Sequence, residues 1–277
     1  MQVPVNQITP KSIFTNAILI QPTPFCALNC KGCYTKSFKG QVQEQLIVDL
    51  IASISSGGLI QCNQVTLAVD NLSDLKSEVA SQKAILLAFL LHAKQRKTST
   101  NFNITVNSSH ALREYGDLDL SGVHMISISN PKSGDSALHK NVSQNLVGIG
   151  AVRQVLDSVY YVLHKPDLGF PVDVIGYFDK MPRGPGVVID TCVADSLKFL
   201  KTGASCSAGI SKFHIWPDGS VTGCPYNQGR ETPGSQGLEG LCENINKVYT
   251  ASNEFSRCKI PQAIDSKSKP RLLNIIN

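Results

Sequence analysis

Short runs rich in Val and Ile alternate with longer helical patterns along most of this chain, and this alternation constrains the fold more than any other feature. The runs are mostly continuous in apolar character, which is typical of strands covered on both faces of a parallel sheet. The predicted strands are Ala17–Gln21, Gln64–Val69, Phe102–Val106, Val123–Ser129, Ser158–Leu163 and Val172–Phe178. The predicted helices are Val42–Ser55, Ser77–Lys97, Ser136–Leu156 and Ala194–Lys201. The pattern predicts an α/β fold, either an open parallel sheet or a partial barrel.

One interval does not fit this alternation. The fifth and sixth predicted strands are separated only by His164–Pro171, whereas a parallel crossover with its helix needs at least about 10–12 residues. Either the fifth helix is missing or one of the two strands is misplaced. After Gly203 the helical periodicity gives way to Gly, Pro, Ser and Cys, so we expect residues 1–203 and 204–277 to form two parts.

Composition and charge exclude several classes of protein. Of 277 residues, 42% are hydrophobic and 17% charged, which is a globular rather than a disordered composition. The net charge of +5 is scattered, so no nucleic-acid partner is expected. The longest apolar run, Ala84–Leu91, is far shorter than the roughly 20 residues of a membrane-spanning helix, so no membrane partner is expected either. No secretory signal is visible, and the predicted location is the cytoplasm, where cysteines are more often metal ligands than disulfides.

Three cysteines follow the first predicted strand in the segment Cys26-Ala-Leu-Asn-Cys30-Lys-Gly-Cys33. Thiolates this close on one loop can converge on a soft metal centre, either an iron–sulfur cluster or zinc. The spacing of three residues and then two differs from the paired spacing of zinc ribbons. With no fourth Cys or His nearby, three protein ligands would leave one coordination position open.

This CxxxCxxC segment after the first strand of an α/β chain resembles the signature of the radical S-adenosylmethionine (SAM) enzymes. The resemblance implies a partial (β/α)6 TIM-like barrel in which Cys26, Cys30 and Cys33 hold a 4Fe–4S cluster. It also implies that SAM binds the fourth iron and is cleaved to a 5′-deoxyadenosyl radical, which abstracts a hydrogen atom from the substrate.

Two positions depart from the family pattern. The aromatic residue usual before the third cysteine is replaced by Gly32, and Tyr34 follows the cluster instead. Where the second strand of the family ends in Gly-Gly-Glu, this chain has Ala68-Val69-Asp70-Asn71. The resemblance makes Asp70 a candidate ligand of the SAM amino group; the alternative is a turn or helix-cap residue.

The third and fourth strands end in further candidates. Asn107 ends a segment close to the Thr-Asn-Gly of the family, and Ser127 and Ser129 stand where the family has Ser-Leu-Asp. The resemblance implies that they bind the ribose or carboxylate of SAM, and the alternative for Asn107 is a strand-end turn. All of these candidates follow or end strands, where barrel-type α/β enzymes build their sites.

A second group of cysteines lies in the C-terminal part. Cys206 and Cys224 flank a hairpin signal, Pro217-Asp218-Gly219, and Cys242 and Cys258 follow. A hairpin brings two such thiols together; a structural zinc or unligated buried thiols are the alternatives. The segment resembles the twitch form of the SPASM extensions of radical SAM enzymes, which implies a second, auxiliary 4Fe–4S cluster held by these four cysteines. Cys62 and Cys192 are left as structural residues.

The resemblance implies an enzyme that modifies a ribosomally made peptide by cross-linking, epimerisation or backbone excision. Only 25 residues precede Cys26, too few for a peptide-recognition domain, so a separate small recognition protein is expected, together with a reductant such as flavodoxin or ferredoxin. Two other functions stay open: a small-molecule dehydrogenase, for example of an amino-sugar alcohol, and a non-catalytic metal-binding protein.

Overall fold

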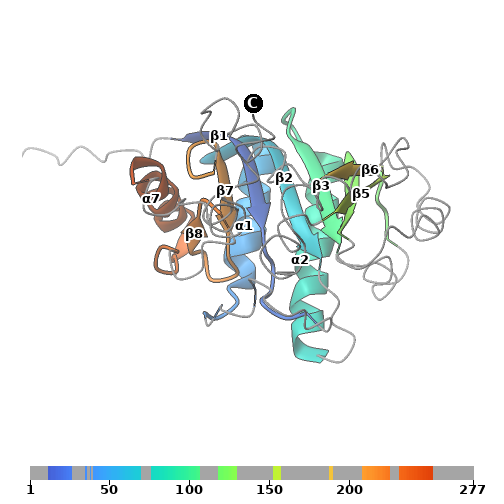
Figure 1. The fold of residues 1–277 in the computed structure, drawn as a ribbon, viewed down its shortest axis with the longest axis horizontal. Coiled ribbons are helices and arrows are strands. Elements are labelled where there is room, and N and C mark those ends of the chain that lie inside the picture. The colour runs from blue at the N-terminus through green and yellow to red at the C-terminus, as the bar shows by residue number, and fades with distance from the viewer. Residues whose placement is uncertain are drawn as a thin grey trace, which may run out of the picture.

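One eight-stranded sheet forms the centre of the computed structural model (Figure 1). The structure describes residues 12–26, 35, 38, 40–69, 76–106, 118–129, 152–156, 187–189, 208–224 and 231–251. Its strands are β1 (Ile13–Ile20), β2 (Ile60–Val69), β3 (Asn101–Val106), β4 (Met125–Ser129), β5 (Val152–Leu156), β6 (Val187–Ile189), β7 (Lys212–Ile215) and β8 (Val221–Thr222). Their order is β6-β5-β4-β3-β2-β1-β7-β8.

The first six strands run parallel, and each pairs with the next along the chain. Such sequential parallel order is what successive βαβ units produce. The predicted α/β class with a parallel sheet, wound as in a partial barrel, is therefore confirmed. The expected strands that end at Val69, Val106 and Ser129 are all present.

One described strand lies where the sequence predicted the end of a helix. Val152–Leu156 was expected to end a helix that begins at Ser136, but it forms β5 and pairs with β4. The β-branched Val152 and Val155 favour a strand, and Gly148 and Gly150 weaken a helix that would lead into it. The predicted strands Ser158–Leu163 and Val172–Phe178 and the predicted helix Ala194–Lys201 lie outside the described residues.

The short interval His164–Pro171 also lies outside the described residues. Between the described strands β5 and β6 lie residues 157–186, which is longer than the 10–12 residues that a parallel crossover needs.

Three helices are described: α1 (Glu44–Ser56), α2 (Lys76–Gln95) and α7 (Gly237–Thr250). Helix α1 contacts α2, β2 and α7, and α7 also contacts β8 (Figure 1). Helix α1 ends, as predicted from Gly57-Gly58, with Gly57 in the left-handed conformation at φ 76° and its N–H bonded to the Ser53 carbonyl. Within the described residues, no helix combines the length and apolarity needed to cross a bilayer.

Apolar side chains on one face of β1, β2, β3 and β7 enter one hydrophobic core. The buried strand residues and the helix residues packed with them include Ile18, Ile20, Val65, Leu67, Phe102, Ile104, Phe213, Ile215, Ile47, Leu50, Ile51, Phe89, Leu241 and Ile245. Phe89 of α2 lies over Phe102 of β3 with ring centroids 5.0 Å apart. Because β7, β8 and α7 contribute to the same core as β1–β3, the C-terminal hairpin is an extension of the central sheet.

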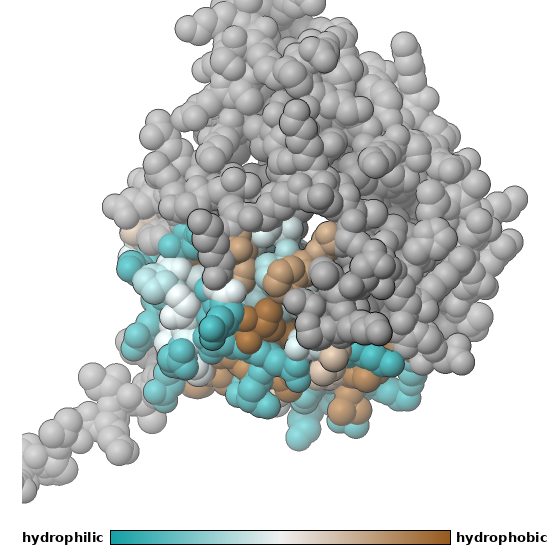
Figure 2. Space-filling model, turned by 90° about the horizontal axis from the view of Figure 1, so that it is seen from below, coloured by the Kyte–Doolittle hydropathy of each residue, from teal (hydrophilic) through white to brown (hydrophobic). Residues whose placement is uncertain are grey.

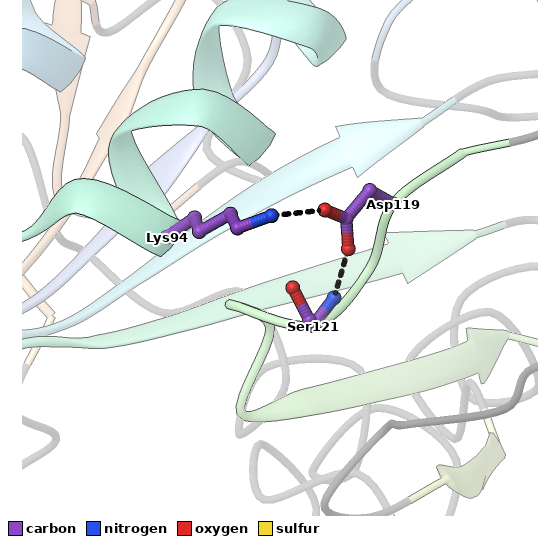
Figure 3. Close-up of polar contacts among 3 residues, drawn as sticks. All are labelled: Lys94, Asp119 and Ser121. Carbon is purple, nitrogen blue, oxygen red and sulfur yellow. Dashed lines mark hydrogen bonds and ion pairs between the residues drawn. The ribbon is translucent and has the colours of Figure 1, made fainter.

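The end of α2 is attached to the turn before β4 (Figure 3). Lys94 Nζ lies 2.6 Å from Asp119 Oδ2, and the Ser121 N–H donates to Asp119 Oδ1 at 3.0 Å. This hydrogen-bonded ion pair holds the pKa of the Asp119 carboxyl well below its usual range. Both side chains are more than half exposed, so the pair adds little stability and serves mainly to hold this turn.

The described surface mixes hydrophilic and apolar residues (Figure 2). Its exposed large apolar side chains come from several separate elements: Phe14, Phe25, Leu87, Leu91, Ile210 and Tyr249. Single exposed apolar residues are ordinary on globular proteins.

The hairpin predicted from Pro217-Asp218-Gly219 is confirmed. β7 and β8 are antiparallel, with Ile215 opposite Val221, and Gly219 has φ 76°. The turn is held from outside: Ser235 Oγ donates to the Gly219 carbonyl at 2.6 Å, and the Ser235 N–H donates to the Asp218 carbonyl at 3.0 Å. Asn244 of α7 in turn donates to Ser235 Oγ at 2.7 Å.

Replacing Gly219 with alanine is expected to lower the free energy of unfolding by about 3 kcal/mol, the sum of a left-handed backbone and a steric overlap. A Cβ there would lie 2.5 Å from Leu46 Cδ2 and 2.9 Å from Ser235 Cβ. Gly237→Ala is the matched control, because Gly237 has φ 73° and no atom within 4 Å of its added Cβ; it should lose only about 1 kcal/mol. Urea unfolding of both variants measures the difference, and equal losses would contradict the overlap.

Candidate metal and cofactor site

The carboxyl ends of parallel strands share one edge of the sheet, and β2, β3 and β4 all end at this edge. Val69, Val106 and Ile128 lie in one register row across β2, β3 and β4. The residues that follow them in the sequence are Asp70, Asn107 and Ser129. Three of the five candidate SAM contacts therefore each follow one member of a single row in the sequence.

The side chains at this edge are described only in part. Ser127 and Ser129 belong to β4 by their backbone. Cys30, Cys33, Tyr34, Asp70 and Asn107 lie outside the described residues. Cys26, the first cysteine of the cluster, is described and is half-buried.

The segment that leads from β1 to Cys26 is held on two sides. The Gln21 N–H donates to the Ile215 carbonyl at 2.9 Å, and Gln21 Nε2 donates to the Thr23 carbonyl at 2.9 Å. Thr23 Oγ1 donates to Gln82 Oε1 of α2 at 3.2 Å. Gln21, Thr23 and Gln82 are all buried, so the chain is fixed between α2 and β7 just before Cys26. A half-buried thiol on a fixed backbone segment is suited to act as a metal ligand beyond the carboxyl end of β1.

Sequence reasoning missed one polar residue of the sheet. Arg153 of β5 pairs in register with Ser127 of β4, which pairs with Thr105 of β3. It was overlooked because its segment was predicted to be helical. The strand pairing, and no local pattern, brings an arginine next to a candidate SAM contact.

The second face of the sheet is more polar than the core face. His214, Leu19, Thr66 and Asn103 form one register row across β7, β1, β2 and β3. Asn103 is 3% exposed, and its Oδ1 accepts no hydrogen bond from the residues that the structure describes. A buried acceptor of this kind ordinarily has a donor, which a water or a polar ligand on this face would provide.

Burial lowers the pKa of His214 to about 3, which keeps its imidazole neutral. Its ring lies 4.6 Å from that of Trp216, at an interplanar angle of 42°. The unfolded chain binds a proton near pH 6.5, and the folded chain does so only near pH 3. The stability that depends on this group is therefore complete above about pH 6.5 and is lost as the pH falls toward 3.

This gives a prediction for acid unfolding. Between pH 6.5 and 3 the free energy of unfolding should fall by up to about 1.4 kcal/mol per pH unit through His214 alone. His214→Phe, which keeps an aromatic ring beside Trp216, should remove that slope when urea unfolding is repeated across the range. His124→Gln, at an exposed histidine, is the control and should leave the slope as it is; a wild-type slope in His214→Phe would refute the assignment.

The described auxiliary cysteines have different surroundings. Cys224 follows β8 and is half-buried, while Cys242 of α7 lies in the hydrophobic core at 5% exposure. Burial, with Glu239 and Glu243, raises the pKa of the Cys242 thiol, so a metal at Cys242 would have to displace its proton. Cys206 and Cys258 lie outside the described residues, and among the residues described no group of three metal-binding side chains is assembled.

Cys62, which was predicted to be structural, is buried in the core. Burial raises its pKa to about 12. Its thiol therefore stays protonated near neutral pH, as expected of a structural cysteine.

No family model matches the sequence, and no curated protein matches it. Among solved structures, the chain is similar to BtrN in complex with AdoMet and 2-DOIA, at 11% identity and a TM-score of 0.42 over 93% of this chain and 88% of BtrN. It is similar to Streptococcus suis SuiB bound to precursor peptide SuiA, at 11% identity and a TM-score of 0.43 over 87% of this chain and 67% of SuiB. It is also similar to native anSMEcpe with bound AdoMet, at 13% identity and a TM-score of 0.45 over 94% of this chain and 99% of anSMEcpe.

Proposed function

We propose that this chain is a radical SAM enzyme. The observation that carries the proposal is the CxxxCxxC segment, whose first cysteine follows β1 at the carboxyl edge of a sequentially wound parallel sheet. In the sequence, Asp70, Asn107 and Ser129 each directly follow one member of the register row Val69, Val106 and Ile128. Three thiolates and polar residues that follow the strand ends are the donor set that a cluster and an amino-acid-bearing nucleoside need.

In this proposal Cys26, Cys30 and Cys33 hold a 4Fe–4S cluster with one iron left for SAM. When bound and reduced, such a cluster supplies the electron that splits SAM and leads to hydrogen abstraction from the substrate. The carboxylate of Asp70 accepts hydrogen bonds from the SAM amino group, and Asn107, Ser127 and Ser129 bind its ribose and carboxylate. Tyr34 packs beside the cofactor. Arg153, whose backbone pairs in register with Ser127, adds a positive charge for the carboxylate.

The C-terminal part holds a second 4Fe–4S cluster through Cys206, Cys224, Cys242 and Cys258. The proposal is supported by the confirmed hairpin between the first two of these cysteines. Cys242 lies on α7, which packs against β8, the strand that precedes Cys224.

The substrate we propose is a ribosomally made peptide, because the C-terminal segment resembles the twitch extension. A small recognition protein delivers it, flavodoxin or ferredoxin supplies the electrons, and the reaction takes place in the cytoplasm. The peptide is cross-linked, epimerised or cut within its backbone.

The test is anaerobic reconstitution of the full chain with iron and sulfide, followed by reduction in the presence of SAM. We expect about eight irons per chain, four for each cluster, and reductive formation of 5′-deoxyadenosine. Zinc in place of iron, or iron without SAM cleavage, would show a structural or binding protein. Deoxyadenosine that increases with a small alcohol rather than with a peptide would show a small-molecule dehydrogenase.

A further inference from the structure

The C-terminal hairpin contacts both stems of the loop that carries Cys26, Cys30 and Cys33. The incoming stem is residues 21–26 and the outgoing stem is residues 38 and 40–43; of the residues 27–37 between them the structure describes only Thr35. The incoming stem is bonded to β7 through the Gln21 N–H and the Ile215 carbonyl, at 2.9 Å. Trp216 directly follows Ile215, so the incoming stem is bonded to the hairpin next to its turn.

The outgoing stem rests on the same turn. Phe38 stacks on Trp216 with ring centroids 5.6 Å apart and an interplanar angle of 10°. The Gln43 N–H donates to the Pro217 carbonyl at 2.9 Å, and Gln43 Nε2 donates to the Asp218 carbonyl at 3.2 Å. The backbone of Gly40 lies so near the Asp218 carboxylate that a Cβ at Gly40 would overlap it.

Trp216 itself is held rigidly. It is 3% exposed, and the His214 ring lies against it. The Trp216 N–H donates to the Ser220 carbonyl and its carbonyl accepts from Gly219 N–H, both at 2.9 Å. Because Ser235 and Asn244 fix Gly219 from outside the hairpin, the support extends from α7 through the turn to the loop.

We infer that Trp216 is a positioning residue: by stacking on Phe38 it holds the outgoing stem against the hairpin, and so fixes the described end of the loop to which the proposed function assigns the cluster ligands. The inference rests on the proposed function and deepens it, since it makes the C-terminal hairpin part of the SAM-cluster site. An error of about 1 Å in the position of reacting groups costs roughly 100-fold in rate, so a loosened stem is expected to lower the rate of SAM cleavage as well as the stability of the chain.

The test compares Trp216→Leu with Phe89→Leu in the reconstituted full chain. Phe89 is also a buried aromatic residue paired with another ring, Phe102, but on α2 and β3. Each variant is measured for unfolding in urea, for the change that SAM produces in the electron paramagnetic resonance spectrum of the reduced protein, and for deoxyadenosine formation. Trp216→Phe, which keeps a stacking ring, is the rescue, and Phe38→Leu loosens the same stack from a partly exposed residue if Trp216→Leu does not fold.

We expect Trp216→Leu or Phe38→Leu to lose the SAM-induced spectral change and about 100-fold in deoxyadenosine formation. Phe89→Leu should keep both at comparable stability, and Trp216→Phe should recover most of them. If both stack variants respond to SAM as the wild type does, or if Phe89→Leu loses the response equally, the role of Trp216 is refuted. A wild-type chain that binds iron and does not respond to SAM at all would instead overturn the proposed function.

Discussion

Cys26→Ala is expected to reduce the iron content of the reconstituted chain from about eight to about four and to abolish deoxyadenosine formation, a loss of at least about 1,000-fold. A 4Fe–4S cluster with an open iron has only three protein thiolates, so two cannot hold it in place. Cys26 is half-buried at the end of the incoming stem, and its replacement leaves the hydrogen bonds of Gln21 and Thr23 intact. The measurements are iron and sulfide analysis and quantification of deoxyadenosine.

Cys62→Ala provides the matched control. This substitution also removes one thiol, but Cys62 is a residue of β2 that is buried in the hydrophobic core. Burial raises its pKa to about 12. This variant should keep all of the iron and the activity. If Cys26→Ala keeps them too, the loop does not bind the SAM cluster.

Ending the chain at Gly203 is expected to prevent folding altogether. The missing part includes β7, which pairs with Ala17–Ile20 of β1, and several side chains of the shared core: Phe213, Ile215, Val221, Leu241, Ile245 and Val248. Truncating even one large core residue to alanine costs about 2–5 kcal/mol, and a whole domain is stable by only about 5–15 kcal/mol. Circular dichroism and size-exclusion chromatography of residues 1–203 should show an unfolded or aggregated chain.

The graded version of this experiment is Ile215→Ala in the full chain. Ile215 is fully buried, and its carbonyl bond to Gln21 does not depend on its side chain. We expect a loss of about 2–5 kcal/mol with cooperative unfolding retained. If residues 1–203 instead unfold cooperatively near the temperature of the full chain, the two parts fold independently, as the predicted division at residue 203 implies.

Local sequence patterns predicted the elements that carry their own signals. Gly57-Gly58 marked the end of α1, and Pro217-Asp218-Gly219 marked a hairpin in which Gly219 has the positive φ that such a turn requires. The β5 segment failed because its five residues are compatible with either a helix end or a strand. Its pairing with β4 decided between them.

The sequence by itself determined the α/β class, the strands that end at Val69, Val106 and Ser129, and the loop spacing of Cys26, Cys30 and Cys33. Each of these is predicted by residues that are close in the sequence, through apolar runs, turn residues or the spacing of ligands. Only the tertiary structure decided that the C-terminal hairpin joins the sheet beside β1, where Thr15 Oγ1 donates to the carbonyl of Ser211, 196 residues away. Such pairing follows from the burial of a shared core and the completion of strand hydrogen bonds, and no local pattern encodes it. The same pairing brings Trp216 against Phe38 and places the hairpin in contact with the incoming and outgoing stems of the loop that carries Cys26.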